Sequence, residues 1–255
     1  MKKLLLATVG LGTVAVSIPA LAADLQVKRA YTKAPTAVVA TVYDWSGLYA
    51  GFNAGGGSSR NCWGLVQNAG VVVNAAANRE GCNSAGGAAV GGQIGYRYQM
   101  ENWVFGVEAQ GDWASFSGTN RNLILPTLND RSRVNGFGLF TGQVGYAFNN
   151  VLGYVKGGAA VVGDRYDTTT IATGALVDSA KTTRWGGTVG AGLEYGFSPN
   201  WTVGVEYDHI FMGNKNLNFT NAAGTTAMIH NIKQDADIGL LRVNYKFGPG
   251  FGFMR

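Results

Sequence analysis

The side chains that could do chemistry in this sequence are charged residues that alternate with apolar ones. Nine of them fall on one side of such segments: Arg97, Glu108, Asp112, Lys156, Glu194, Glu206, Asp208, Arg242 and Lys246. If they share one interior, they could form a catalytic set or line an ion-conducting path. They could instead neutralise one another, because a buried charge without a partner is costly. Four bases against five acids favour a salt-bridge network.

Other motifs for catalysis are weak. The glycine-rich stretch Gly187 to Gly192 lies inside an alternating pattern with no helix after it, so it lacks the form of a phosphate-binding loop. We find no Gly-x-Ser-x-Gly sequence and no convincing Ser, His and acid set. Neither His209 nor His230 has a nearby Cys or His with which to complete a metal site. We therefore expect no catalytic residue, cofactor or metal ion.

Cys62 and Cys82 are the only two cysteines. Their spacing is not the Cys-x-x-Cys of redox enzymes. In an oxidising compartment they should pair, closing a loop of about 20 residues and stabilising the protein by about 3 kcal/mol. We predict a structural disulfide.

The first 22 residues indicate export. Met1 to Lys3 is positively charged, Leu4 to Ile18 is apolar, and Ala20 to Ala22 offers a small-x-small cleavage pattern. A membrane anchor is the alternative, but the apolar stretch is short for a spanning helix of about 20 residues. We predict a cleaved signal peptide (1–22) and a flexible periplasmic segment (23–44).

The composition after the signal peptide is unusual for a soluble protein. Of 255 residues, 39 are glycine and only 14% are charged, against about 25% charged residues in typical soluble domains. Loss of two signal-peptide lysines lowers the net charge from +5 to +3, too little to suggest nucleic-acid binding. No later apolar run could cross a bilayer as a helix. A barrel spreads its apolar face over alternate residues and fits this composition.

A period of two, typical of strands, recurs along the chain. A helix cannot produce it, because its apolar face returns every 3.6 residues. An even strand number suits a closed antiparallel barrel of eight strands, whose interior is only wide enough for side chains. The predicted strands are Gly47–Gly57, Ala88–Tyr98, Trp103–Trp113, Asn135–Phe148, Val151–Gly163, Trp185–Phe197, Trp201–Asp208 and Asp237–Phe247.

The links between these strands alternate in length. The short ones are Gln99 to Asn102, Asn149-Asn150 and Ser198 to Asn200. The long ones are Ser58 to Ala85, Ala114 to Val134, Asp164 to Arg184 and His209 to Ala236. Tight periplasmic turns and longer external loops are the pattern of outer-membrane barrels. We therefore predict a transmembrane barrel over 45–247 with four long extracellular loops, followed by a tail at 248–255.

Aromatic residues cluster at the turn ends of the predicted strands, on the apolar face. Amphipathic rings favour the membrane interface, so they predict a periplasmic girdle. Trp113 and Trp185 mark the opposite ends of their strands and could belong to an external girdle. The periplasmic set is Tyr96, Tyr98, Trp103, Tyr146, Phe148, Tyr195, Phe197, Trp201, Tyr245 and Phe247.

Three segments carry a family resemblance. Tyr43 to Gly51, which reads YDWSGLYAG, resembles the opening strand of small alphaproteobacterial outer-membrane proteins, often called outer-membrane immunogenic proteins, within the outer membrane protein A-like barrel group. Gly142 to Phe148 with Tyr154 to Ala159 resembles their central hairpin, and Leu241 to Phe247 their closing strand. The ordered set, which covers about 45–247, implies a Gram-negative outer-membrane location.

The closing strand also implies a partner. In the family, the barrel-assembly machinery is thought to read this strand, here Leu241 to Phe247. Family members usually stop near the final aromatic residue, whereas Gly248 to Arg255 follows here. Either the machinery recognises Phe247 although it is not the last residue, or the aromatic residues of the tail take part in recognition.

The long links hold more bases than acids. A basic collar at the external rim could bind lipopolysaccharide phosphates by charge-assisted hydrogen bonds. Ordinary solvated loop charges are the alternative. The candidate contacts are Arg131, Arg133, Arg165, Lys181 and Arg184.

The function expected from these features is a structural, surface-exposed role for a barrel whose lumen is filled by paired charges. Its surroundings would be outer-membrane lipids and lipopolysaccharide. A narrow porin-like channel for ions or small solutes is one alternative. An adhesin that contacts a host or another surface through its loops is a second, because loops often carry function.

Overall fold

The computed structural model describes residues 43–68, 70–73, 79–221 and 224–248. The predicted signal peptide, nearly all of the predicted 23–44 segment and most of the 248–255 tail lie outside these residues. The described part consists of strands and short connections, and it holds no helix long and apolar enough to cross a membrane. The strands are β1 (Gly47–Asn68), β2 (Val71–Val72), β3 (Arg79–Met100), β4 (Trp103–Arg121), β5 (Leu128–Phe148), β6 (Val151–Thr170), β7 (Leu176–Ser198), β8 (Trp201–Asn221) and β9 (Thr226–Lys246).

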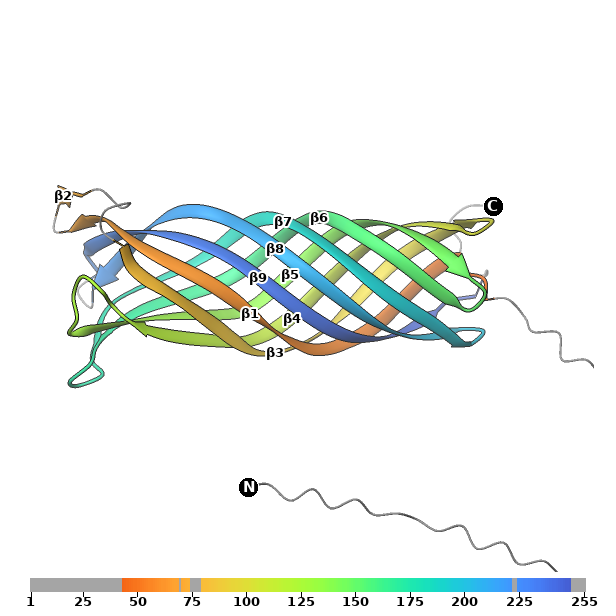
Figure 1. The fold of residues 1–255 in the computed structure, drawn as a ribbon, viewed down its shortest axis with the longest axis horizontal. Coiled ribbons are helices and arrows are strands. Elements are labelled where there is room, and N and C mark those ends of the chain that lie inside the picture. The colour runs from red at the N-terminus through yellow and green to blue at the C-terminus, as the bar shows by residue number, and fades with distance from the viewer. Residues whose placement is uncertain (1–42, 69, 74–78, 222–223, 249–255) are drawn as a thin grey trace, which may run out of the picture. The chain divides into compact units, whose positions relative to one another are not determined.

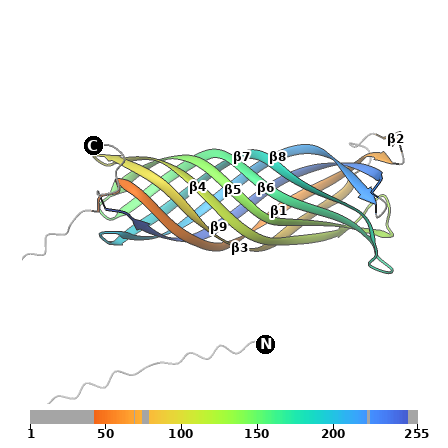
Figure 2. The same ribbon diagram turned by 180° about the vertical axis from the view of Figure 1, so that it is seen from behind.

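Eight long strands close into an antiparallel barrel, which confirms the predicted fold. Each long strand pairs with the next, and β9 pairs back onto β1, while the short β2 pairs only with β1 (Figure 1). The same closed wall is seen from behind in Figure 2. A path that starts at Ser58 of β1 and passes from ladder partner to ladder partner through every long strand returns to β1 at Leu48. The strands are therefore staggered by ten residues around the barrel. Such a stagger goes with strands tilted by about 40° to the barrel axis.

The wall follows the predicted alternation within the membrane. Val107 on β4 is 63% exposed, whereas its neighbour Glu108 is 5% exposed. Successive side chains of a strand point to opposite faces, so the odd residues of this stretch face lipid and the even ones face the lumen. The apolar period-two segments therefore form the lipid-facing belt.

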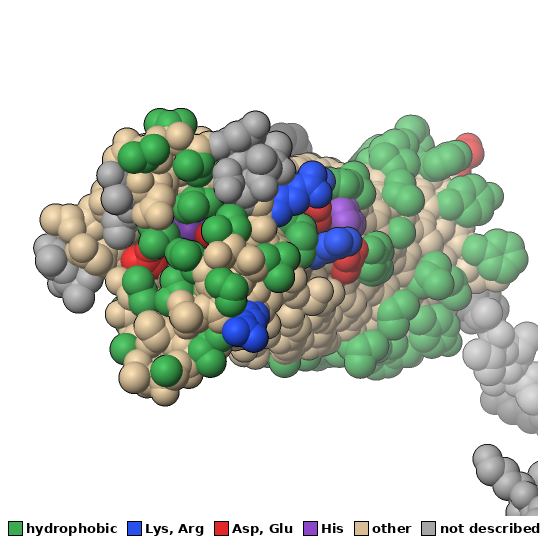
Figure 3. All heavy atoms as spheres, turned by 60° about the vertical axis from the view of Figure 1, so that its left-hand side comes forward, with side chains coloured by type: hydrophobic (Ala, Val, Ile, Leu, Met, Phe, Trp, Pro, Cys, Tyr) green, Lys and Arg blue, Asp and Glu red, His purple; other side chains and the backbone are tan. Residues whose placement is uncertain are grey.

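Aromatic side chains mark both edges of this belt. Nine of the ten predicted periplasmic residues are exposed on the outer wall, and Phe247 is half-buried. Trp113 and Trp185, the external girdle, are 77% and 67% exposed. The ten-residue step from Trp103 to Trp113 on β4 covers about 25 Å along the bilayer normal at this tilt, the height of an apolar barrel belt. Figure 3 shows hydrophobic side chains over the wall farthest from the hairpin tips.

The four long links differ from the prediction, because most of their residues continue the strands. For example, β1 runs to Asn68 and β8 to Asn221, well beyond the expected ends at Gly57 and Asp208. Beyond the external girdle both faces of the wall can be polar, so the apolar alternation disappears while main-chain pairing continues. The links are therefore mainly β-hairpin extensions of the barrel. Among the described residues, strand-free connections remain at 122–127, 171–175 and 224–225.

The inward side chains form layers along the axis. Tyr43 and Trp45 are buried with residues of β4, β5 and β6 at the periplasmic end. A polar layer follows, then an apolar layer that includes Phe137 and Leu139, and then an external cluster that includes Trp63. The order can be followed along β8, where the inward residues are Glu206, Asp208, Ile210, Met212, Leu217 and Phe219.

Candidate functional site

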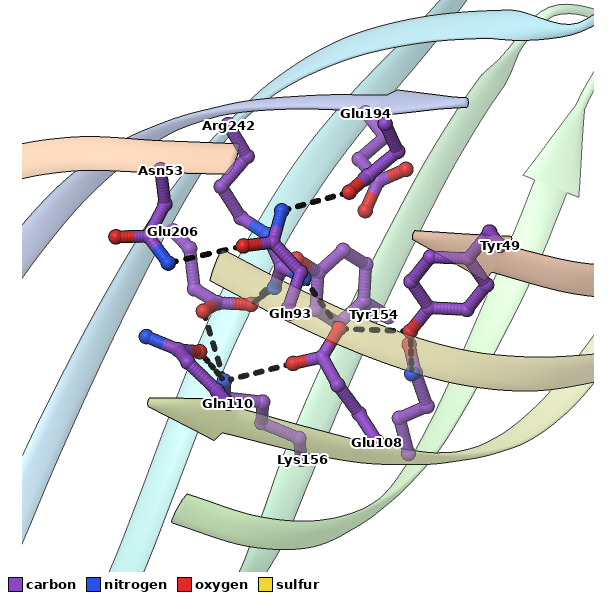
Figure 4. Close-up of polar contacts among 12 residues, drawn as sticks. Tyr49, Asn53, Gln93, Glu108, Gln110, Tyr154, Lys156, Glu194, Glu206 and Arg242 are labelled. Atoms are coloured by element: carbon purple, nitrogen blue, oxygen red, sulfur yellow. Dashed lines mark hydrogen bonds and ion pairs between the residues drawn. The ribbon is translucent and has the colours of Figure 1, made fainter. Parts of the chain in front are cut away.

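Arg242 of β9 lies at the centre of the polar layer (Figure 4). Its guanidinium donates hydrogen bonds to the carboxylates of Glu108 on β4 and Glu206 on β8, and to the Tyr154 hydroxyl at 3.1 Å. The Arg242 side chain is fully buried. A planar fork of donors suits two carboxylates approaching from opposite walls. The arrangement links four strands, β4, β6, β8 and β9, through one cation.

Lys156 of β6 supplies a second cation to the same carboxylates. Its ammonium lies 2.7 Å from Glu206, 3.4 Å from Glu108 and 3.3 Å from Asp208. Because Arg242 and Lys156 share Glu108 and Glu206, these four residues form one compact network. Each charge has an opposite partner, which offsets part of the cost of its burial.

Arg97 of β3 and Glu194 of β7 form a separate pair nearer the periplasm. The guanidinium also stacks over aromatic rings, with its carbon 4.4 Å from the centre of Tyr49 and 5.8 Å from that of Trp45. The Thr202 hydroxyl donates to Glu194 at 3.0 Å. Aromatic faces attract a desolvated cation, so these rings assist the pairing.

Three expected members of the charge set behave differently. Asp112 has no ion pair in the described structure, and it accepts a hydrogen bond from Gln110 at 2.8 Å. Asp208 lies 3.3 Å from the ammonium of Lys156 and also next to Glu206. Lys246 is not in the network, and the expectation for it is wrong: its ammonium bonds the Asp44 carbonyl at the periplasmic mouth. The physical reason is its position as the last residue of β9, on the periplasmic side of the polar layer.

Several uncharged partners were missing from the sequence-based set. The Tyr49 hydroxyl donates to Glu108 at 2.7 Å, and the Tyr154 hydroxyl donates to Glu206 at 2.6 Å. Gln93 bonds both Asn53 and Asn244 in an amide chain beside the network. The sequence does hold a signal for these residues. Each lies an even number of positions from an inward-facing residue of the same strand, so its side chain must also face the lumen.

Two further layers bound the network. Towards the outside lies the apolar layer, with Leu139, Ile210 and Ile238 each 1% exposed. Towards the periplasm the chain before β1 crosses the mouth. There the amide of Tyr43 is held by Asn150, and that of Trp45 by the Gln99 side chain.

The outer wall carries a separate group of bases beyond the external girdle. Arg133 of β5 is the ladder partner of Arg165 on β6, which in turn pairs with Lys181 on β7. Asp167 forms ion pairs with both arginines, at 3.3 Å from Arg133 and 3.0 Å from Arg165. Arg131 follows two residues from Arg133 on the same outer face. We call Arg131, Arg133, Arg165 and Lys181 the basic ladder.

Arg184 does not belong to this ladder, so its predicted place at the external rim is wrong. It is 2% exposed and points into the barrel. Its guanidinium donates to the carbonyls of Met212 at 3.1 Å and Gly213 at 2.8 Å. The adjacent Trp185 faces outward, so the alternation of a strand sends Arg184 inward.

The predicted disulfide is present. Cys62 of β1 and Cys82 of β3 are bonded, and they are ladder partners in neighbouring strands. The bridge lies on the external extension rather than in an irregular loop. Among the residues that the structure describes, no group of three or more His, Cys, Asp or Glu side chains could hold a metal ion.

A barrel with a lipid-facing belt and inward polar residues agrees with the comparison to known families. Residues 10–230 match the family model of the outer membrane protein beta-barrel domain. The chain belongs to this outer-membrane β-barrel family. The predicted family and Gram-negative outer-membrane location are therefore confirmed.

Two Brucella proteins are similar over most of the chain. The 31 kDa outer-membrane immunogenic proteins of Brucella melitensis and Brucella suis are each 31% identical over 205 residues. The matched region covers 78% of this chain and 83% of each relative. Among solved structures, the outer membrane protein OprG from Pseudomonas aeruginosa has a TM-score of 0.50 at 11% identity. It is covered to 98%, against 80% of this chain, and this likeness supports the fold alone.

Proposed function

We propose that this outer-membrane barrel is a non-conducting surface protein, held in the lipopolysaccharide leaflet by its outer wall and displaying its β-hairpin extensions. The observation that carries the proposal is the apolar layer across the lumen. Buried Leu139, Ile210 and Ile238 from β5, β8 and β9 belong to it. A water-filled path for ions needs polar walls, whereas β3, β4, β5, β6, β8 and β9 all contribute buried apolar side chains to this layer.

The polar layer below supports the same function. Lys156, Arg242, Glu108 and Glu206 neutralise one another and are almost fully buried. An eight-strand barrel leaves an interior only wide enough for side chains. The charges then act as the filling of the lumen rather than as a catalytic or permeation set.

Single-channel recording tests this point. The wild-type protein in a planar bilayer should give no steady conductance over a range of voltages. Steady conductance whose ion selectivity changes in Lys156→Gln would favour the narrow channel instead. Heat-dependent migration on a gel verifies beforehand that the tested protein is a folded barrel.

The basic ladder supports the attachment to lipopolysaccharide. Its side chains stand beyond Trp185, on the outer face of three neighbouring strands. This is the level at which the phosphates of the outer leaflet meet a barrel wall. Arginine forks pair well with phosphate oxygens. Arg133 and Arg165 are already spaced to share one anion, since both contact the Asp167 carboxylate.

Lipid retention measures this contact. Replacement of Arg131, Arg133, Arg165 and Lys181 with Gln should lower the lipopolysaccharide that co-purifies, by about tenfold if two phosphate contacts of roughly 0.7 kcal/mol each are lost. Lys246→Gln is the matched control, because it removes one base at the periplasmic mouth. Equal lipid content in the ladder variant and the control would contradict the proposed site.

A second candidate function is adhesion. Exposed apolar side chains stand at separate hairpin ends, with Val72 74%, Leu123 69% and Leu176 51% exposed. Exposed apolar groups in water favour contact with another surface. Replacement of these three residues with Ser should reduce attachment of expressing cells to a host cell layer. Unchanged attachment with an unchanged amount of surface barrel would exclude these ends as the contact.

The barrel-assembly machinery is the proposed partner during insertion. The closing strand, Leu241 to Phe247, alternates outward Leu241, Val243 and Tyr245 with inward residues and pairs with β1. Before the barrel closes, this strand edge is free for another protein to pair with. Cross-linking from position 243 to that machinery during synthesis tests the contact, and an equal yield from position 107 would contradict it.

A further inference from the structure

The wall beyond the external girdle has two seams where ladder pairing between neighbouring strands stops. Among the described residues, β3 and β4 have no ladder pair beyond Gly86 and Ser117. β7 and β8 have none between Ser179 and Gly187 of β7. The seams divide the extension into two leaves. The leaves are joined again near their tips, by the ladder pairs of Asp178 and Ser179 on β7 with β8 and by the main-chain bond from the Leu123 amide to the Glu80 carbonyl at 2.9 Å. The first leaf comprises the external ends of β8, β9, β1 and β3, and the second comprises those of β4 to β7 (Figure 1).

Acidic side chains from the two leaves meet inside the extension. Glu80 and His230 belong to the first leaf, and Nδ1 of His230 lies 2.6 Å from Glu80. Asp130 and Asp178 belong to the second leaf. All four are at most 1% exposed. The Asn122 amide bridges the leaves, because it donates to Glu80 at 2.9 Å and to Asp130 at 3.3 Å.

These four residues line a chamber, and the nearest other charged side chains are Asp164 of β6 and Arg184 of β7. Asp164 interacts with Tyr166 and accepts a hydrogen bond from Gln234 at 2.8 Å. In the described structure no Lys or Arg forms an ion pair with Glu80, Asp130 or Asp178. Arg184, the base one layer deeper, is bonded to main-chain carbonyls and to Gln234. The uncharged side chains of the chamber are Trp63 on β1, Asn122 after β4, Tyr166 and Thr168 on β6, and Phe219 on β8.

Three buried acids against one histidine cannot all stay ionised without cost, because buried like charges repel and lose hydration. The pKa of Asp130 is raised to about 7, mainly by burial and then by the charge of Glu80, while the hydrogen bond from Asn122 opposes the rise. Burial also raises the pKa of Asp178, against the effect of the neighbouring Thr168 hydroxyl. Both residues stand outside the membrane belt.

We propose that the external end of the barrel is an acid-closed clamp, in which protonation of Asp130 and Asp178 lets the two leaves close and their ionisation loosens them. The apolar part of the clamp is the contact between Trp63 of the first leaf and Tyr166 of the second, with ring centres 5.5 Å apart. His230 also lies against Trp63, at 5.5 Å. Closure buries these rings, and opening exposes them to water.

The sign of the pH effect follows from the two aspartates. Each has a folded-state pKa above its unfolded value, so the closed form holds protons more tightly than the open form. The closed form therefore becomes more stable as the pH falls. For Asp130 the gain begins near pH 7, its pKa in the closed form, and is complete below the ordinary pKa of an aspartate. Mild acid should tighten the extension, and mild base should loosen it.

Hydrogen exchange of the full-length barrel in lipid nanodiscs, with EDTA present, tests the clamp. Rates at pH 5.5 and 8.0 are each corrected for intrinsic exchange. Peptides from the seams, 79–85, 118–134 and 180–186, should exchange at least about tenfold faster at pH 8.0, the effect of one unit of pKa difference. Peptides from the membrane belt should exchange at the same corrected rate at both pH values. Equal corrected rates in the seam peptides would overturn the proposal.

Neutral variants separate the two aspartates from other titrating groups. Asp130→Asn with Asp178→Asn should keep the seam peptides slow at both pH values. Asp235→Asn on the outer wall is the matched control and should retain the full pH effect. If the double variant does not give a folded barrel, Asp178→Asn alone should show a reduced effect. A full pH effect in either chamber variant, or slow exchange at pH 8.0 that depends on added Ca²⁺, would overturn the clamp.

Discussion

Arg97 and Glu194 are joined across the lumen by two hydrogen bonds of 2.8 and 2.6 Å. The residues come from β3 and β7, strands that are not neighbours in the wall. Both side chains are almost completely buried. Each therefore depends on the other, because a single buried charge without its partner is far more costly than the pair.

Arg97→Met should lower the free energy of unfolding by about 3–5 kcal/mol, since it leaves Glu194 buried and uncompensated. Urea unfolding in lipid vesicles, followed by tryptophan fluorescence, measures the change. Adding Glu194→Gln to this variant should recover a large part of the loss. If the double variant is as unstable as Arg97→Met, lost packing over Tyr49 rather than the charge is the cause.

Removal of the disulfide should affect the external extension and spare the belt. Cys62→Ser with Cys82→Ser frees a loop of about 20 residues, worth at most about 3 kcal/mol. Protease added to intact cells should then cut within 58–85 several times faster. The heat-dependent gel shift should stay unchanged, because the bridge lies beyond the girdle. Reduced wild-type protein provides the control and should match the variant.

Arg184→Met should loosen the seam between β7 and β8. It removes the bonds to the carbonyls of Met212 and Gly213, and hydrogen bonds to a charged group are each worth about 1.5–3 kcal/mol. Amide exchange should accelerate in 180–186 and 212–219, with no change in retained lipopolysaccharide. Lost lipid with unchanged exchange would place Arg184 on the outer wall after all.

Gly196→Ala should displace the chain that crosses the periplasmic mouth. A methyl group at Gly196 would lie 2.4 Å from the Tyr43 ring, which must then leave its site. Chymotrypsin added from the periplasmic side should cleave after Tyr43 faster than in the wild type. Gly111→Ala is the control, because its added methyl meets nothing within 4 Å. Similar cleavage in both variants would mean that Tyr43 is not held there.

The sequence predicts the membrane part of this fold well, because lipid imposes a strict rule on alternate residues. Trp103, Val107 and Trp113 had to face out, so Glu108 had to face in. The same rule does not operate in water, where β1 continues past Gly57 with polar residues on both faces. The length of the link therefore predicts a loop charge at Arg184, although the outward Trp185 beside it implies that Arg184 points inward.

The candidate site was only partly predictable for a different reason. The charged residues of the polar layer stand out among apolar neighbours, but Ile210 and Ile238 do not. When the outer face of a strand is apolar, an inward isoleucine interrupts the alternation of polar and apolar residues. Its inward direction then cannot be recognised from the sequence. Register across the barrel also depends on the ten-residue stagger. The meeting of Arg242 with Glu108, from strands that are not neighbours in the wall, requires the closed fold.

The ladder-paired extension has a consequence for any reagent directed against the cell surface. Its outer face presents Arg133, Arg165 and Lys181 side by side, although they are far apart in the chain. An antibody raised against the folded barrel would recognise such composite epitopes. A linear peptide copied from one strand carries only a single row of that surface, so peptide immunogens should elicit sera that bind denatured protein better than intact bacteria.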